Sequence, residues 1–341
     1  MFPTKSSFLS LKPPTLVTPN RFVPPLHSFP IHRHPRTLAT MSTSEPPPSL
    51  PKMPSLIYGT AWKKDRTADL VYEAIKAGFR GIDTAAMKRH YDETLVGEGI
   101  RRAVSEGIVS RNDLWIQTKY TPSPSTHYTS TNPLTTSLTT SIASSLSNLS
   151  TPDHQPPYLD ALILHSPFET LPENITAWTH LTSYLPNQIR HLGYSNVPPD
   201  FLDVFDEFLD LNPSLPRVSL IQNRFTAGMY NWDIETRRWC KGNGAVYQGF
   251  WVLTGNVDVW RHAKVVREVK KGLGLGSLEE AWLAVVMVGM GVRVLDGTTK
   301  GEHMRGDLGV GERVREWRGE REENERKWER WVGEVRGLVG G

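Results

Sequence analysis

The chain has 341 residues, of which 38% are hydrophobic, and a formal net charge of +3 at pH 7. This length allows a substantial buried core. Basic residues are scattered among acidic ones rather than gathered in a patch or stripe, so we expect no nucleic-acid partner. No segment approaches the roughly 18 consecutive apolar residues of a transmembrane helix, so we expect no membrane partner either.

Only one cysteine, Cys240, is present, which excludes an internal disulfide. A reducing compartment, the cytoplasm, is the simplest expectation. We expect Cys240 to be an inert core residue, because free cysteines are commonly buried. No Cys/His grouping has zinc-site spacing, and we expect no metal.

The first 52 residues differ in composition from the rest. They are rich in Ser, Thr and Pro, and their first acidic residue is Glu45. This composition is typical of a transit peptide, which would indicate a mitochondrial location. Eight prolines before position 36 would, however, break the amphipathic helix of such a peptide. We predict a disordered or transit-like extension over 1–52, with Met41 as an alternative start, and one domain over 53–341.

Strand-like and helix-like segments alternate through that domain. Eight short apolar runs are expected strands, and helical periodicity separates several of them. Such alternation predicts parallel strands joined by crossover helices, closed into an α/β, (β/α)8 TIM barrel. The expected strands are 56–58, a run ending at 82, 114–118, 161–164, 189–193, 218–221, 245–250 and 292–295; the expected helices are 67–76, 92–106, 134–149, 199–209 and 278–288.

Two segments depart from this rhythm. Residues 121–136 form a Ser/Thr/Pro loop after the third strand, where a barrel has either a substrate lid or a surface insertion. Residues 312–338 are highly charged but carry apolar side chains at helical spacing. We predict a C-terminal closing helix that packs on the barrel through Trp317, Trp328, Trp331, Val335 and Leu338.

Ionisable residues follow the apolar strands at matching places. Asp83, Lys119 and His165 each come directly after an apolar run, and Tyr91 lies in the loop after Asp83. In a parallel barrel these positions share one face. The set suits carbonyl reduction, in which Tyr91 is the proton donor, Lys119 lowers its pKa and Asp83 orients Lys119. His165 is then expected to hydrogen-bond the substrate oxygen.

Seven motifs stand in order between Ser55 and about Asp307, namely residues 59–62 (Gly-Thr-Ala-Trp), 81–85 (Gly-Ile-Asp-Thr-Ala), 96–100 (Val-Gly-Glu-Gly-Ile), 117–119 (Gln-Thr-Lys), 158–167, 189–196 and 221–223 (Ile-Gln-Asn). Together they resemble the aldo-keto reductase family. This resemblance implies a (β/α)8 barrel that reduces aldehydes and ketones with a nicotinamide cofactor, usually NADPH, and it implies Asp83, Tyr91, Lys119 and His165 as the catalytic tetrad.

The resemblance also implies the residues that bind cofactor and substrate. Ser195, Asn196 and Gln222 would hydrogen-bond the nicotinamide carboxamide, and Phe250 would stack on its ring. The remaining cofactor-binding positions are Gly59, Thr60, Leu253, Thr298, Thr299, His303 and Asp307, and the substrate-binding positions are Trp62, His90 and Ser166.

The loop that carries the tyrosine departs from the family pattern. Eight positions separate Asp83 from Tyr91, which is longer than the family's usual spacing, so the loop contains an insertion. Counting back from Asp92-Glu93 instead places His90 in the tyrosine position. His90 is therefore a rival proton donor. We favour Tyr91, because Lys119 can activate a phenol and a phenol keeps its proton at neutral pH.

The nucleotide end departs further. Where the family often has lysine and arginine for the 2'-phosphate, this chain has Gly297 and His303. Thr298 and Thr299 at a helix N-terminus still suit a phosphate, and Lys300 and Arg305 can supply charge. We therefore expect NADPH, with NADH as the alternative.

On the substrate side, Ser166 stands where the family usually has tryptophan, which predicts acceptance of larger or more polar carbonyl compounds. We accordingly expect a reductase of small-molecule aldehydes and ketones that is a monomer or weak oligomer. Two rivals stay open. One is an NADP-binding regulatory or redox-sensing protein with little turnover, and the other is a metal-dependent lyase or isomerase on the same barrel.

Overall fold

The computed structural model describes residues 50, 52–122 and 133–339, and the fold is described for these residues. The predicted extension over 1–52, apart from Leu50 and Lys52, lies outside them. So does most of the predicted loop over 121–136.

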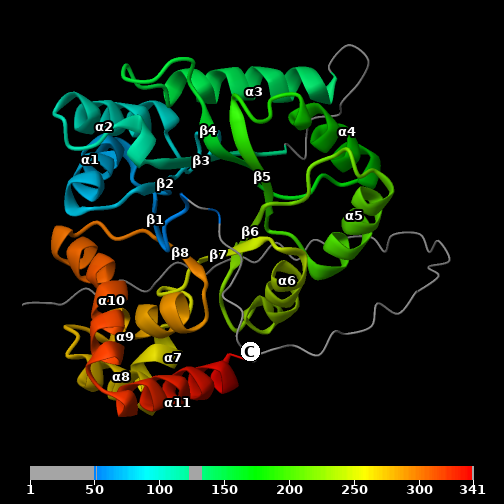
Figure 1. Ribbon diagram of the computed structural model, residues 1–341. Coiled ribbons are helices and arrows are strands. Elements are labelled where there is room, and N and C mark those ends of the chain that lie inside the picture. The colour runs from blue at the N-terminus through cyan, green and yellow to red at the C-terminus, as the bar shows by residue number, and fades with distance from the viewer. Residues whose placement is uncertain (1–49, 51, 123–132, 340–341) are drawn as a thin grey trace, which may run out of the picture. The chain divides into compact units, whose positions relative to one another are not determined.

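Eight parallel strands close into a barrel in sequence order, β1 through β8, with β8 paired to β1 (Figure 1). Each predicted strand is present, so the predicted fold class is confirmed. Register is set by pairs such as Tyr58 with Ile82 and Gln222 with Gln248. The strands are β1 (Leu56–Gly59), β2 (Gly81–Asp83), β3 (Trp115–Tyr120), β4 (Leu159–Leu164), β5 (Ile189–Ser195), β6 (Leu220–Arg224), β7 (Val246–Phe250) and β8 (Arg293–Asp296).

Helices surround the barrel and include four that the sequence pattern did not predict, namely α4, α6, α7 and α8 (Figure 1). The helices are α1 (Thr67–Ala77), α2 (Glu93–Ser105), α3 (Leu134–Asn148), α4 (Leu171–Thr182), α5 (Pro199–Leu211), α6 (Tyr230–Asn243), α7 (Val257–His262), α8 (Lys264–Leu273), α9 (Leu278–Leu283), α10 (Gly301–Glu320) and α11 (Glu322–Leu338). Two short 3-10 helices are η1 (Lys64–Arg66) and η2 (Arg111–Asp113). A π-helix, η3 (Ala284–Gly289), continues α9.

Local signals set several helix ends and contacts. Asp92 caps α2 by accepting a hydrogen bond from the Leu95 amide (3.1 Å), and Thr170 and Glu173 form a capping box at α4. Gly97 of α2 lies so close to α3 that a Cβ there would come within 1.9 Å of the Asn148 carbonyl oxygen. The glycine in the 96–100 motif therefore permits close packing of α2 on α3.

The predicted closing helix is two helices, which corrects the single helix expected over 312–338. Arg321 is extended (φ −152°, ψ 143°) and separates α10 from α11. The Asn324 side chain donates to the Trp317 carbonyl across this break (2.7 Å), and Trp317 stacks on Trp331 at 5.1 Å between centroids. The predicted packing of the tryptophans is correct. The prediction for Leu338 is wrong, because its side chain is 46% exposed at the last turn.

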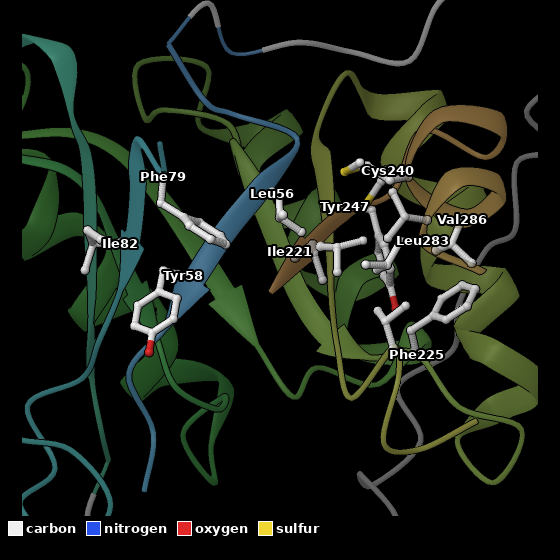
Figure 2. Packing of buried hydrophobic residues seen from close by; sticks show 14 of the residues in the cluster. Leu56, Tyr58, Phe79, Ile82, Ile221, Phe225, Cys240, Tyr247, Leu283 and Val286 are labelled. Carbon is white, nitrogen blue, oxygen red and sulfur yellow. The ribbon is translucent and has the colours of Figure 1, made fainter. Parts of the chain in front are cut away.

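Two apolar layers hold the barrel together. The larger one lies between strands and helices, and Figure 2 shows Tyr58 and Phe79 on one side of it and Tyr247, Leu283 and Val286 on the other. Cys240 lies in this layer, as predicted, and burial raises the pKa of its thiol. The smaller layer fills the barrel near the strand starts and contains Met53, Ile57, Trp115, Ala161, Ile163, Leu220 and Val246. Strand alternation explains this division, since Ile57 faces inward while its neighbours Leu56 and Tyr58 face the helices.

Among the described residues, no single helix combines the length and apolarity needed to cross a membrane. Only the pair Lys264–Leu273 and Leu278–Gly289, bent by 99°, reaches that combination jointly.

Candidate active site

Asp83 and Lys119 form a buried ion pair inside the carboxyl end of the barrel. Asp83 ends β2 and Lys119 lies on β3, and their side chains are 2% and 1% exposed. The Lys119 ammonium donates to both carboxylate oxygens of Asp83 (2.7 and 2.6 Å) and to the Thr84 carbonyl (2.9 Å). A buried pair of this kind is stabilised only when its remaining hydrogen-bonding capacity is satisfied, and here it is. The sequence pattern predicted that these two residues meet.

A layer of three glutamine amides supports the carboxylate of this pair. Gln117 and Gln222 each donate to Asp83 Oδ1 (2.7 and 2.9 Å). Gln248 exchanges two hydrogen bonds with Gln117 and accepts one from Gln222. Sequence reasoning assigned no role to Gln117 or Gln248. The sequence features that could have indicated them are a glutamine two residues before Lys119 and another inside the seventh apolar strand, both at inward-facing positions.

Tyr91 lies beside this ion pair, in the loop between β2 and α2. Lys119 Nζ is 5.2 Å from the centroid of the Tyr91 ring, and the rings of Tyr91 and His165 meet edge to face with centroids 6.1 Å apart. Burial raises the pKa of Tyr91, and the Asp83 carboxylate adds to the rise. Lys119 lowers the pKa, as predicted, but burial has the larger effect. The expectation of a net decrease is therefore wrong, and the phenol holds its proton more firmly at neutral pH.

His90, the rival proton donor, stacks on Trp62. The two ring centroids are 3.9 Å apart, and the Trp62 amide donates to the His90 carbonyl (2.8 Å). The Trp62 ring is 63% exposed. Burial lowers the pKa of His90, and the charge of Arg89 lowers it further. Within the described residues, Lys119 contacts the Tyr91 ring and has no such contact with His90, so the geometry favours Tyr91.

His165 follows β4 and has a neutral imidazole ring. Burial lowers its pKa to about 3, helped by the charges of Lys119, His90 and Arg224. Its Nδ1 lies 2.8 Å from Thr121 Oγ1, and its amide donates to the Tyr120 carbonyl (2.8 Å). Thr121 therefore fixes the ring, which leaves Nε2 as the other polar atom. Ser166, the next residue, is half-buried.

Ser195 and Asn196, at the end of β5, hydrogen-bond their neighbouring strands. Ser195 Oγ donates to the Gln222 carbonyl (2.7 Å), and Asn196 Nδ2 donates to the His165 carbonyl (2.9 Å) and to Ser195 Oγ (3.1 Å). Asn196 has a positive φ of 51°, which asparagine tolerates well. These bonds tie the predicted carboxamide-binding residues to the predicted catalytic histidine, although the Gln222 amide itself points to Asp83.

The chain matches the family model described as the aldo/keto reductase family over residues 55–241, more than half of its length. The protein belongs to the aldo-keto reductase family. It is 46% identical over 68 residues to the NAD(P)H-dependent D-xylose reductase of Pachysolen tannophilus, and 47% identical over 70 residues to the NADPH-dependent aldose reductase of Saccharomyces cerevisiae. Each match spans 20% of this chain and 20% of the relative.

A longer match, 29% identical over 194 residues, is to an uncharacterized oxidoreductase of Schizosaccharomyces pombe and covers 51% of this chain and 54% of that protein. Among solved structures, the Bombyx mori aldo-keto reductase in complex with NADP is similar with a TM-score of 0.59 and 19% identity. That similarity covers 78% of this chain and 88% of the Bombyx chain, and it shows the shared fold.

The family model ends before β7, and the last part of this aldo-keto reductase has its own features. Phe250 ends β7 and is half-buried, with Trp251 meeting it edge to face at 6.2 Å. Trp251 has a positive φ of 61° and is 47% exposed. Leu253, also predicted to bind cofactor, packs against the outer apolar layer.

Three predicted cofactor-binding residues lie near β1 and β8. Thr60 is buried and its hydroxyl donates to the Asp83 carbonyl (2.9 Å), so its side chain holds β1 to β2. The amide of Thr298 donates to Asp296 Oδ1 (3.0 Å), and Lys63 donates to the Gly297 carbonyl. A Cβ added at Gly59 would lie 3.5 Å from the Asp296 carbonyl oxygen, so these two strand ends run close together.

The N-terminus of α10 follows this loop and has no side-chain cap at Lys300. Thr299 immediately precedes Lys300, and His303 in the first turn is exposed. Asp307, one turn further, is buried, and burial together with the nearby Asp296 carboxylate raises its pKa to about 8. The exposed end of α10 can therefore accept a phosphate, whereas its buried side is acidic.

Proposed function

We propose that this protein reduces aldehydes or ketones to alcohols with a reduced nicotinamide dinucleotide. The observation that carries the proposal is the position of Tyr91, whose ring lies 5.2 Å from Lys119 Nζ and edge to face with neutral His165. Carbonyl reduction requires a hydride at carbon and a proton at oxygen. The cofactor, when bound, supplies the hydride, and the chain supplies the proton.

Each residue has a chemical task in this proposal. Tyr91 donates its phenolic proton to the carbonyl oxygen, and Lys119 stabilises the phenolate that remains. Asp83 holds Lys119 through the pair of hydrogen bonds described above. His165 orients the carbonyl oxygen with its neutral ring, because its pKa of about 3 leaves it uncharged at neutral pH.

The residues present fit a dinucleotide. Phe250 offers an aromatic face at the carboxyl end of β7, and the uncapped N-terminus of α10, with Thr298, Thr299 and Lys300 before it, offers amides to a phosphate. We propose NADPH as the cofactor, since named relatives include an NADPH-dependent aldose reductase and a structural neighbour is an NADP complex. Cytoplasmic location and a monomeric or weakly oligomeric state stay predictions.

The test is NADPH oxidation, followed by its absorbance, with a panel of aldehydes, sugars and quinones. We expect Tyr91→Phe to lower kcat by roughly 10²- to 10⁴-fold, the usual contribution of a positioned general acid. His90→Ala is the control and should keep most of the activity. If His90→Ala abolishes turnover while Tyr91→Phe keeps it, the assignment of the acid is wrong.

The same assay separates the rival functions. Quenching of tryptophan fluorescence by NADPH without oxidation on any carbonyl compound would indicate a regulatory binding protein. Activity on small aliphatic aldehydes alone would contradict the wide pocket predicted from Ser166. A strong preference for NADH in kcat/KM would contradict NADPH as the cofactor.

A further inference from the structure

Arg224 lies at the carboxyl end of the barrel, on the same face as the proposed catalytic residues. It is the last residue of β6 and pairs in register with Phe250. Leu220 and Gln222 of this strand face the barrel interior, one in the inner apolar layer and one on Asp83. Because strand side chains alternate, Arg224 belongs to the same inward-facing row.

The guanidinium of Arg224 has aromatic neighbours and, within the described residues, no carboxylate partner. It lies 5.5 Å from the Phe250 ring centroid and 4.9 Å from that of Trp251. Its Nε is buried and has no hydrogen-bond partner in the described part of the chain. Keeping a half-buried cation charged without a counter-ion costs free energy, and burial accordingly lowers the pKa of Arg224.

Arg111 shows how this chain satisfies a buried guanidinium that serves structure. It donates to Asp160 Oδ2 (2.8 Å) and to the Leu114 and Tyr158 carbonyls (2.9 Å each). No comparable set of acceptors surrounds Arg224 among the described residues. The two aromatic rings lie near the guanidinium of Arg224, and its Nε has no acceptor among the described residues.

The charge of Arg224 acts on the carbonyl site. It is one of the charges that lower the pKa of His165, so the guanidinium and the imidazole are electrostatic neighbours. Lys119, the other cation that lowers this pKa most, is already paired with Asp83. An anion next to a carbonyl group bound at His165 would meet Arg224 as its partner.

We propose that Arg224 binds the carboxylate of the substrate, so that the enzyme prefers carbonyl compounds that carry a carboxylate over neutral ones of the same size. This inference rests on the proposed reductase function. A planar guanidinium matches a carboxylate with two parallel hydrogen bonds, which gives both affinity and orientation. The phosphates of the cofactor are the competing anion.

The experiment compares 4-carboxybenzaldehyde with its neutral methyl ester, methyl 4-formylbenzoate, as substrates with NADPH. For the wild-type protein we expect a higher kcat/KM with the acid. Arg224→Gln should lower kcat/KM for the acid by about tenfold or more, mainly through KM, and should change that for the ester by less than about twofold. Arg224→Lys keeps the charge but lacks the planar guanidinium that can donate two parallel hydrogen bonds. Its kcat/KM for the acid should lie between those of wild type and Arg224→Gln.

Arg315→Gln removes the same charge from the exposed surface of α10 and should behave as wild type. Thermal unfolding and the dissociation constant of NADPH, from tryptophan quenching, are measured for every variant. Equal losses on both aldehydes, or a weakened affinity for NADPH with no preference between aldehydes, would assign Arg224 to the cofactor and overturn the proposal. Turnover of both aldehydes at equal efficiency by wild type and Arg224→Gln would overturn it while leaving the reductase function intact. If NADPH is oxidised neither with the acid nor with the ester, the proposed reductase function itself is contradicted.

Discussion

The ends of β2 to β4 and the ends of β6 to β8 satisfy their charged groups in different ways. At β2 and β3, Asp83 and Lys119 neutralise each other, and two glutamine amides donate to the carboxylate while a third, Gln248, holds those two in place. At β6 and β8, Arg224 has no carboxylate partner among the described residues, and Asp296 and Asp307 are two acids side by side. The first region is built to hold one arrangement of charge. The second region contains a cation, Arg224, that a bound anion can neutralise, and a pair of acids that a proton can neutralise.

The family match covers residues 55–241, which include all of the first region and Arg224 of β6, and it leaves β7, β8 and α10 outside. A proton donor works only within a narrow geometry, which fixes the residues around Tyr91 closely. Cofactor and substrate contacts can be redistributed along the strand ends, because charge and aromatic surface act over several ångströms. Three changes of side chain test this contrast.

Lys119→Met should have the largest effect on stability, because it leaves the Asp83 carboxylate buried without a cation. We expect a loss of about 3 to 5 kcal/mol in the free energy of unfolding, measured by urea denaturation. Lys264→Met removes an exposed ion pair with Glu268 and should cost less than about 1 kcal/mol. The double variant Asp83→Asn, Lys119→Met should recover much of the loss. A single-variant loss no larger than that of Lys264→Met would mean that the pair is not the anchor of this region.

Asp307→Asn should have a smaller, pH-dependent effect at the other region. The pKa of Asp307 is raised to about 8, far above its unfolded value near 4, so the folded protein holds a proton that the unfolded chain releases between these values. Wild-type stability should therefore fall as pH rises through this window, by at most about 1.4 kcal/mol per pH unit from this group. Asparagine stays neutral, so the variant should lose this component and gain relative to wild type at pH 8.

The matched control is Asp258→Asn at an exposed position of α7, which should keep the wild-type dependence on pH. Thermal unfolding at pH 4 to 8 measures all three proteins. If Asp307→Asn and wild type change in parallel over this range, the two acids are already ionised in the folded protein and the contrast between the regions fails.

The sequence could predict site residues that directly follow an apolar strand. Asp83, Lys119 and His165 each follow an apolar run, and the parallel barrel brings such positions together. Gln117 and Gln248 could not be found this way, because their role depends on which face of each strand is turned inward. Arg224 could not be found from the sequence either, because only the folded structure shows which described side chains surround its guanidinium. The break at Arg321 and the exposed Leu338 depend on where α11 docks, which helical spacing alone does not determine.

Thr121→Val should have the smallest effect, and it tests how tightly the first region is set. Thr121 Oγ1 lies 2.8 Å from His165 Nδ1 and so determines which ring nitrogen would face the carbonyl oxygen in the proposed reaction. Valine keeps the shape and removes one hydrogen bond, worth about 0.5 to 1.5 kcal/mol, so we expect kcat to fall by about two- to tenfold. The KM for NADPH should not change.

A matched pair elsewhere in the chain gives the control. Thr139 Oγ1 lies 3.0 Å from His180 Nε2 at an exposed site between α3 and α4, and Thr139→Val should leave kcat unchanged. Because the pKa of His165 is about 3, kcat/KM of wild type should show no titration of His165 between pH 5 and 8. If Thr121→Val introduces such a titration, the threonine also keeps the ring neutral; if kcat is unaffected, the orientation of His165 depends on its backbone and on Asn196 rather than on this hydrogen bond.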